Sequence, residues 1–466
     1  MNISIKRNLA GLLLIYGLLG AIFFYLWLDI PDIYFINYGI LLLAYILIGG
    51  VTFLFWSSGK VKFFEPFTII SFLYMMILII YPLYDYTNLN VYKSGVDTSS
   101  GCIKGTLIFM ISYLFFCCGY FGSAVKNRKS TFFKRIERLN SNKMSLIAFV
   151  CWIVSFAGAM AGQISRGFSW NFILSMGSVG QDDIIVNSSS GGLLFLLMLI
   201  PTMIVSEIMI LNYSKNAFLK IATFLFTFVF LFMRGGRMLM IDMLAAPVIL
   251  WYLKQKKSPT VRTICASFAV AISLFAVLQI ARQDISQGHD FRESLADNLF
   301  SVKTYMSVFD SDFSTYKVYY GIVNAFPEQY DYLFGRGMIG YTAALIVPRA
   351  LWPDKPDAPE REVVYDAMGQ EAMDNGNAYP NIGIFYSEFG IVGTLILMFL
   401  YGVVMSKVRN LYRMESESAL ILYACLWPFC FQLTTRSFSN AVYTLLFGFL
   451  PMGICWLLSS NRRKEF

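Results

Sequence analysis

The chain of 466 residues alternates between long apolar runs and short polar connections through most of its length. An apolar run of roughly 20 residues, folded as an α-helix, crosses about 30 Å of hydrocarbon with every backbone polar group bonded internally. The pattern predicts about twelve such helices, over 9–28, 33–56, 67–84, 103–125, 144–164, 193–211, 217–233, 238–253, 263–281, 381–406, 419–434 and 441–458. We therefore expect an all-α polytopic membrane protein.

One connection is much longer than the others. Residues 1–281 hold the first nine predicted helices and a smaller loop near 165–192, residues 282–380 form the long loop, and residues 381–466 hold the last three helices. The first part of the long loop, up to residue 332, predicts short amphipathic helices that lie over the bundle. Its apolar segment near 337–351 is too short to span comfortably and predicts a re-entrant or interfacial helix.

Composition and charge agree with this class and set the orientation. A chain with 57% hydrophobic residues, 14% charged residues and a mean hydropathy of +0.59 is not a soluble globular protein. Of the 37 lysines and arginines, 23 fall in short connections on one side, which the positive-inside rule makes cytoplasmic. Both termini are then cytoplasmic, and the long loop lies on the outer side of the membrane. We expect no nucleic-acid partner, because the net charge of +8 and the basic stretch 126–143 reflect this bias.

The sequence lacks the motifs of several common kinds of binding site. The chain has no phosphate-binding glycine loop or nucleotide fingerprint, and its eight cysteines show neither metal-type spacing nor a disulfide framework. Its single histidine cannot form a His-rich metal site. We expect no metal and no cofactor. For the intramembrane acids Glu207 and Asp242, we expect pairing inside the bundle.

Arginine is the residue type that points to function. Six arginines fall at the predicted outer mouth of the bundle: Arg166, Arg234, Arg237, Arg282, Arg349 and Arg436. Arginine is normally rare there, and the anions met at this depth are lipid phosphates and pyrophosphates. The alternative is that these side chains cap helix ends, contact headgroups or, for Arg282, snorkel to the interface.

Two stretches of sequence resemble a known family. FGRGMIGYTAALIVPRALWPDKP, at 334–356, and NAYPNIGIFYSEFGIVG, at 377–393, resemble the long outer loop and next helix of Wzy-type oligosaccharide repeat-unit polymerases, the O-antigen polymerases. The MRGGRM pair of arginines at 233–238 and the helix layout add to the resemblance. One departure concerns an acid: relatives often carry glutamate directly after the glycine that aligns with Gly383, whereas here Ile384 follows and the acid is Glu388.

The resemblance implies a fold similar to the C-type glycosyltransferases and a function in lipopolysaccharide biosynthesis at the bacterial inner membrane. Such an enzyme joins oligosaccharide repeat units carried on undecaprenyl diphosphate at the periplasmic face. Guanidinium groups can stabilise the departing diphosphate without a metal, and displacement from the opposite side inverts the anomeric carbon. Implied partners are lipid-linked oligosaccharides, membrane lipids, a chain-length regulator and a flippase.

The site residues follow from this chemistry. The six arginines are candidates for diphosphate binding, and Arg166 has a glycine, Gly177, at a spacing noted in some relatives. Glu388 and His289 are the catalytic candidates, because an acceptor hydroxyl must lose a proton; the alternative for His289 is plain solvent exposure. Further substrate-binding candidates flank the family-like motif or could stack on sugars, although the two rings could equally be interfacial anchors: Arg336, Lys355, Tyr341 and Trp352.

Two other activities would use similar features. An O-antigen ligase takes the same donor but transfers the glycan to a lipid A core. A lipid-linked oligosaccharide flippase or other transporter also needs cations for diphosphate, yet should show charges through both halves of the bundle. A purely structural membrane partner would leave the outer arginines without a purpose. The sequence does not indicate which sugars are joined, the chain length or the oligomeric state.

Overall fold

The computed structural model describes residues 3–58, 61–123, 131–164, 193–234, 237–286, 301–345, 347, 351–352, 359–374, 378–414, 416–435 and 438–460. All twelve apolar runs are helical. The first half contains α1 (Ile3–Trp27), α2 (Asp32–Ser57), α3 (Pro66–Met75), η1 (Met76–Ile80), α4 (Tyr81–Thr87), η2 (Ser99–Gly101), α5 (Cys102–Gly122), α6 (Thr131–Ile136), α7 (Ser141–Ile164), η4 (Leu193–Leu199), α10 (Ile200–Tyr213) and α11 (Ala217–Arg234).

The second half is also helical. It contains α12 (Arg237–Lys254), α13 (Val261–Ser286), α15 (Val302–Phe313), α16 (Thr315–Ala325), η5 (Arg336–Tyr341), α17 (Thr342–Leu345), α18 (Pro359–Met368), α19 (Gln370–Asp374), α20 (Asn381–Arg413), α21 (Glu417–Thr435), α22 (Phe438–Gly448) and α23 (Leu450–Ser460). The predicted spans therefore occur as helices, with ends that differ by a few residues because capping and kinks, not hydropathy, decide where a helix stops.

Membrane character follows from length and composition. Among the described residues, eight helices or joined helices are long and apolar enough to cross a membrane: 32–57, 66–87, 99–122, 141–164, 196–213, 381–413, 417–435 and 441–459. Shorter apolar helices lie in α1, α11 and α13, and α12 carries Asp242 within its apolar run. The chain is thus a multi-pass, all-α membrane protein, and the count of twelve crossings stays a prediction.

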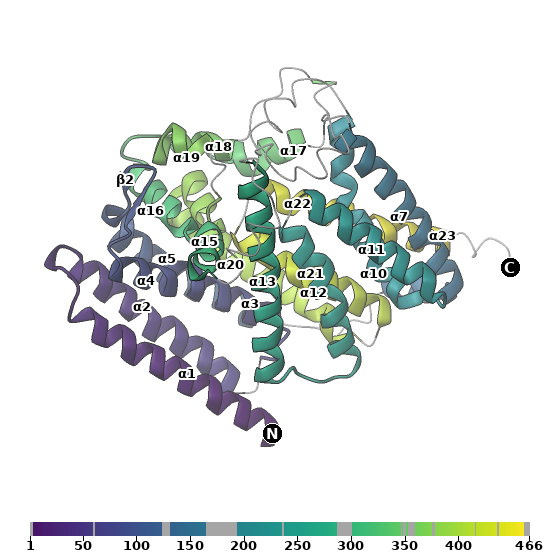
Figure 1. Cartoon of the computed structure of the whole chain (residues 1–466), viewed down its shortest axis with the longest axis horizontal. Helices are drawn as coiled ribbons and strands as arrows, with labels where there is room; N and C mark the ends of the chain where they lie inside the picture. The colour runs from purple at the N-terminus through teal and green to yellow at the C-terminus, as the bar shows by residue number, and fades with distance from the viewer. Residues whose placement is uncertain are drawn as a thin grey trace.

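The helices form two groups, each around its own core (Figure 1). The first core joins α2, α3, α4, α5, α16, α18 and α20. The second joins α6, α7, α10, α12, α21 and α23. In Figure 1 the elements α16 to α19 and strand β2 (Val96–Asp97) lie along the upper edge, and the α12–α13 connection lies along the lower edge. We call the upper edge the loop face and the lower edge the opposite face.

Helices α5 and α20 pack with their backbones in contact. A Cβ added at Gly119 would lie 2.1 Å from the Phe399 carbonyl oxygen, and one added at Gly402 would lie 2.2 Å from the Phe116 carbonyl oxygen. Glycine at both positions is what lets the two helices approach this closely. The pair forms the centre of the first core and carries one end of α20 to the loop face.

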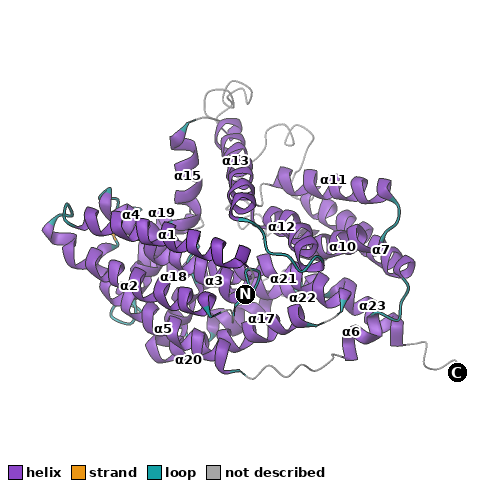
Figure 2. Ribbon diagram, turned by 90° about the horizontal axis from the view of Figure 1, so that it is seen from below, coloured by secondary structure: helices purple, strands orange, loops and turns teal. Residues whose placement is uncertain are grey.

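The long loop differs from its prediction in two ways. Helix α16 does not lie over the bundle as an amphipathic surface helix, because Val318, Tyr319 and Ile322 are all fully buried in the first core. Among the described helices of the loop, α15 stands apart beside α13, where both project from the bundle (Figure 2). The helix expected near 337–351 covers only η5 and α17, and ends at Leu345. Pro348 three residues later disfavours helical backbone before it.

A β-hairpin, which the sequence did not predict, follows α4. Strands β1 (Tyr92–Lys93) and β2 (Val96–Asp97) pair antiparallel, with Lys93 opposite Val96. Ser94 and Gly95 form the turn with φ values of 48° and 78°. Two successive positive φ angles match the right-handed twist of a two-residue hairpin. The hairpin lies against α16 on the loop face.

Candidate functional site

The family-like motif folds around a break in α20. Gly390 interrupts this helix with φ 66° and ψ −163°, a conformation open almost only to glycine. The break leaves the carbonyl groups of Ser387 and Glu388 without their usual partners four residues on. Backbone N–H groups of Leu333 and Phe334 donate to these two carbonyl oxygens at 3.0 and 2.9 Å. The segment before the motif is thereby fixed to the end of the first part of α20.

Glu388 holds the start of η5. Its side chain is buried, and the backbone N–H groups of Gly335 and Met338 donate to its two carboxylate oxygens at 2.7 and 2.8 Å. A carboxylate at the amino end of a helix satisfies exposed N–H groups and opposes the helix dipole favourably. Main-chain donors therefore compensate the buried charge of Glu388. Its catalytic role stays a prediction.

The other described candidates lie on the same segment. Arg336, the first residue of η5, is exposed, Tyr341 at the end of η5 is half-buried, and Trp352 is 41% exposed. Because the Glu388 carboxylate fixes Gly335 and Met338, the backbone of Arg336 between them is also held. An exposed guanidinium on a fixed backbone is a suitable anion contact.

The structure describes the side chain of none of the six predicted arginines. Arg234 ends α11, Arg237 begins α12 and Arg282 lies near the end of α13, while the side chains of all three lie outside the described parts. Outside the described residues altogether are the remaining five candidates: Arg166, Arg349, Arg436, His289 and Lys355. The helix ends nearest to these positions are described, and they can be located relative to one another.

Two contacts set the register between α12 and α21. The Gln432 side-chain amide donates to Asp242 Oδ2 at 2.6 Å, and Lys254 forms an ion pair with Glu417 at 2.5 Å. The two helices are therefore antiparallel. The first residue of α12 and the last residue of α21, Thr435, lie at the same end of the bundle. The Asp242 contact also fits the expected pairing of this acid inside the bundle.

The other relevant ends adjoin this pair. Helix α22, which begins two residues after position 436, packs against η5, α17 and η4. Segment η4 in turn packs against α7, which ends two residues before position 166. The helix ends that flank Arg166, Arg237 and Arg436 thus lie in one contiguous group of elements, next to the motif segment that contains Arg336.

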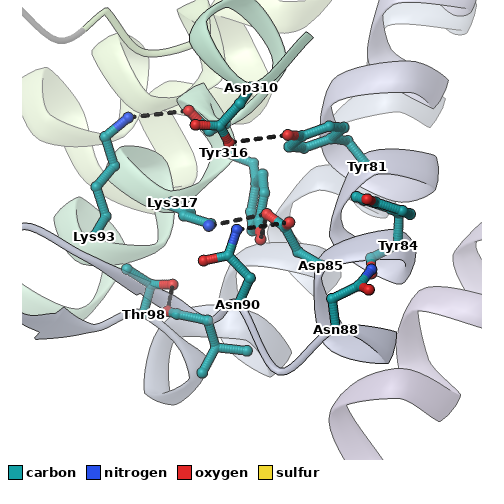
Figure 3. A network of polar contacts seen from close by, with 12 residues as sticks. Tyr81, Tyr84, Asp85, Asn88, Asn90, Lys93, Thr98, Asp310, Tyr316 and Lys317 are labelled. Atoms are coloured by element: carbon teal, nitrogen blue, oxygen red, sulfur yellow. Dashed lines mark hydrogen bonds and ion pairs between the residues drawn. The ribbon is translucent and has the colours of Figure 1, made fainter. Parts of the chain in front are cut away.

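A buried polar network on the loop face joins α4 to α16 (Figure 3). Lys317 of α16 forms an ion pair with Asp85 of α4, with 3.0 Å between Nζ and Oδ2 and side-chain exposures of 3% and 1%. The Tyr316 hydroxyl donates to Asp85 Oδ2 at 2.8 Å, and the Asn90 amide donates to Oδ1 at 3.1 Å. The charges are therefore paired and hydrogen-bonded, as burial requires.

Neighbouring groups extend this network. The Tyr81 hydroxyl donates to Asp310 Oδ1 at 2.9 Å, and Lys93 of the hairpin donates to the Ser314 hydroxyl at 3.1 Å. Burial lowers the pKa of Lys93 to about 8, against an opposing effect of Asp310. The sequence did not predict this network, although an isolated lysine within the aromatic run TYKVYYGIV is a signal for a buried partner.

Comparison with known proteins gives no assignment. No family model matches the chain, and no curated protein or solved structure matches it. The resemblance to Wzy-type polymerases therefore rests on the sequence motifs and on their chemistry.

Proposed function

We propose that the chain is a glycosyltransferase that polymerises oligosaccharide repeat units carried on undecaprenyl diphosphate. The observation that supports it most is the grouping of helix ends on the bundle. The start of α12 and the end of α21 lie at the same end of an antiparallel pair, and α22, which follows α21, packs against η5 and α17. Arg237 and Arg436 lie at these ends, and Arg336 and Arg349 lie on or after η5 and α17. Arginine side chains that converge near these ends would suit a diphosphate.

The proposal includes an architecture and a location. The twelve apolar helices cross the bacterial inner membrane, both termini are cytoplasmic, and the layout is similar to the C-type glycosyltransferases. The loop face is then periplasmic, which is where the long loop and the arginines are needed. Lipopolysaccharide biosynthesis is the pathway, and membrane lipids, a flippase and a chain-length regulator are the partners.

The proposed reaction forms one bond and breaks another. An acceptor hydroxyl oxygen attacks the anomeric carbon of the donor, the bond from that carbon to the diphosphate oxygen breaks, and the diphosphate takes the electron pair. The hydroxyl proton leaves to a base, for which His289 is a candidate. Arginines stabilise the charge on the leaving diphosphate, so loss of one such contact costs about 100- to 1000-fold in rate. No metal ion or cofactor takes part in this proposal.

Within this proposal Glu388 is a positioning residue. Both of its carboxylate oxygens accept main-chain N–H groups of the motif segment, so its contribution is to hold Arg336 and the residues after it in place. The prediction of a base at this position would instead need the carboxylate to reach the acceptor hydroxyl.

The test is polymer formation by purified protein reconstituted in liposomes with lipid-linked repeat units. We expect Arg237→Ala and Arg349→Ala to lose activity about 100-fold or more while the protein level in the membrane persists. The matched control is Arg262→Ala, because Arg262 is exposed at the start of α13 on the opposite face. Normal polymerisation by both variants would contradict diphosphate binding by these arginines.

The same assay separates the alternatives. Chain growth with lipid-linked repeat units alone supports a polymerase. Transfer only after lipid A core is added would identify a ligase. Movement of the lipid-linked glycan between leaflets without lengthening would identify a flippase or transporter.

A further inference from the structure

A polar cavity on the loop face lies outside the candidate site described above. It has a volume of about 620 Å³ and lies between the β-hairpin, the end of α16 and the junction of α18 with α19. Small-molecule sites in proteins have volumes of roughly 300 to 1,000 Å³, so this cavity can hold a ligand of more than one ring.

Glycines shape the cavity. At its base α16 and α18 are in close contact, because a Cβ added at Gly321 would lie 2.3 Å from the Met368 sulfur. Gly369 ends α18 with φ 82°, and Gly95 forms the hairpin tip with φ 78°. A left-handed glycine at the end of a helix turns the chain sharply, here from α18 into α19. The glycines therefore set the course of the backbone around the cavity.

Two tyrosine rings border the cavity and remain accessible. Tyr330 and Tyr365 are 38% and 47% exposed. The Tyr330 ring packs on Phe326, with 5.9 Å between ring centroids, and Phe326 itself is buried. The ring is thus supported on one side and available on another. Accessible aromatic faces with a polar tip suit a ligand with both C–H and hydroxyl surfaces.

The polar groups around the cavity can both donate and accept hydrogen bonds. Asn324 and Gln329 carry amides, which offer two donors and an acceptor each. Asp97 and Asp366 add acceptors, and the Ser99 backbone N–H donates to Asp97 Oδ1 at 2.8 Å, which orients that carboxylate. Burial and the nearby Glu362 raise the pKa of Asp366.

The charges of the residues that line the cavity indicate which class of ligand it can bind. Its described residues include two carboxylates and no lysine or arginine, so the cavity does not suit a diphosphate. A simple cation would need acceptors alone and would leave the amide N–H₂ groups unused. Sugar hydroxyls both donate and accept, and sugar rings present C–H faces to aromatic rings. The lining therefore matches a neutral or amino sugar and opposes a uronic acid.

We propose that this cavity between the hairpin, α16 and α18 is a carbohydrate subsite that holds sugar rings of the lipid-linked glycan. The inference rests on the proposed function for the source of the glycan. Helix α18 packs against both α16 and η5, so the subsite adjoins the segment of Arg336. A glycan held here has its lipid diphosphate available to the arginines rather than to the cavity itself.

The test separates sugar binding from diphosphate binding. The probes are the oligosaccharides released by mild acid from the lipid-linked pool of producing cells, and undecaprenyl diphosphate without sugar. Binding to protein in nanodiscs is measured by saturation-transfer NMR for the free glycan and by isothermal titration for the lipid. We expect Tyr330→Ala and Tyr365→Ala each to weaken glycan binding about tenfold and to leave undecaprenyl diphosphate binding unchanged.

Two controls keep the test decisive. Tyr365→Phe retains the ring and should bind glycan nearly as wild type does. Tyr84→Ala removes an equally exposed tyrosine, 40% exposed, that does not line the cavity, and should also bind normally. Absent glycan binding by wild type, or unchanged binding by both alanine variants, overturns the subsite. Tyrosine-dependent glycan binding without chain growth supports the subsite and overturns only the polymerase.

Discussion

The ion pair between Lys317 and Asp85 gives the sharpest test of what holds α16 in the first core. Its ions are 3.0 Å apart and almost fully buried. Two unit charges at this distance attract by about 5.5 kcal/mol at an effective dielectric constant near 20, and each ion loses several kcal/mol of hydration on burial. The net value of the pair is therefore small, but loss of one partner leaves the other charge buried and alone.

We expect Lys317→Met and Asp85→Asn each to lower the free energy of unfolding by about 3 to 5 kcal/mol. The double variant should cost less than the sum by about 2 to 3 kcal/mol, because no charge is then unpaired. SDS titration in mixed micelles gives the four free energies of unfolding that this cycle requires.

The matched control is the pair Lys254 and Glu417, whose side chains are 38% and 49% exposed. Solvent screens this pair, so its coupling should stay below about 1 kcal/mol. Single variants of the buried pair that cost under about 1 kcal/mol, or a double variant whose cost equals the sum, would refute the reasoning.

Three further predictions concern the loop face. Glu388→Gln places an amide N–H₂ against a main-chain N–H and should lower the free energy of unfolding in SDS titration by about 1.5 to 3 kcal/mol. We expect the rate of polymerisation to fall and its pH profile to stay unchanged. Loss of one limb of that pH profile would instead indicate that Glu388 acts as a base. Gly390→Ala strains a positive φ and places its Cβ 2.8 Å from the Tyr332 ring, so the free energy of unfolding should fall by about 1 to 3 kcal/mol. An unchanged free energy of unfolding would show that the break in α20 is not needed. The pKa of Lys93 is lowered from 10.5 to about 8, so between these pH values the unfolded chain binds more protons than the folded chain and the free energy of unfolding rises with pH. Lys93→Met should remove that rise in melting temperatures measured from pH 7 to 10. The titration of the charged groups around Lys93, which are Asp310, Asp85 and Lys317, must be the same in both proteins.

The apolar pattern predicted the helices well, because crossing a membrane demands about 20 apolar residues whatever the neighbours are. The same reasoning could not place α16. Its run of tyrosine, valine and isoleucine around one lysine reads as amphipathic until Asp85, more than 200 positions earlier, is known to lie opposite. Contacts between distant segments decide such burial, and one sequence does not contain them.

The roles of the candidate site residues stay predictions. The motif segment and Glu388 meet at the break in α20, and the sequence could not indicate that main-chain N–H groups would surround the carboxylate. Whether the six arginines share one anion stays a prediction. The hairpin at Ser94 and Gly95 was missed because its strands are two residues each, too short for an alternating pattern.

The backbone contact at Gly119 and Gly402 has a consequence for motion in this protein. Helices whose main chains touch cannot slide past one another without collision, whereas helices joined through side chains such as Val408 and Leu433 can shift by small rotamer changes. We therefore expect α5 and α20 to move as one rigid unit. Under the proposed function, any widening of the molecule to admit a lipid tail or release a lengthened product would occur by shear between α20 and the second core.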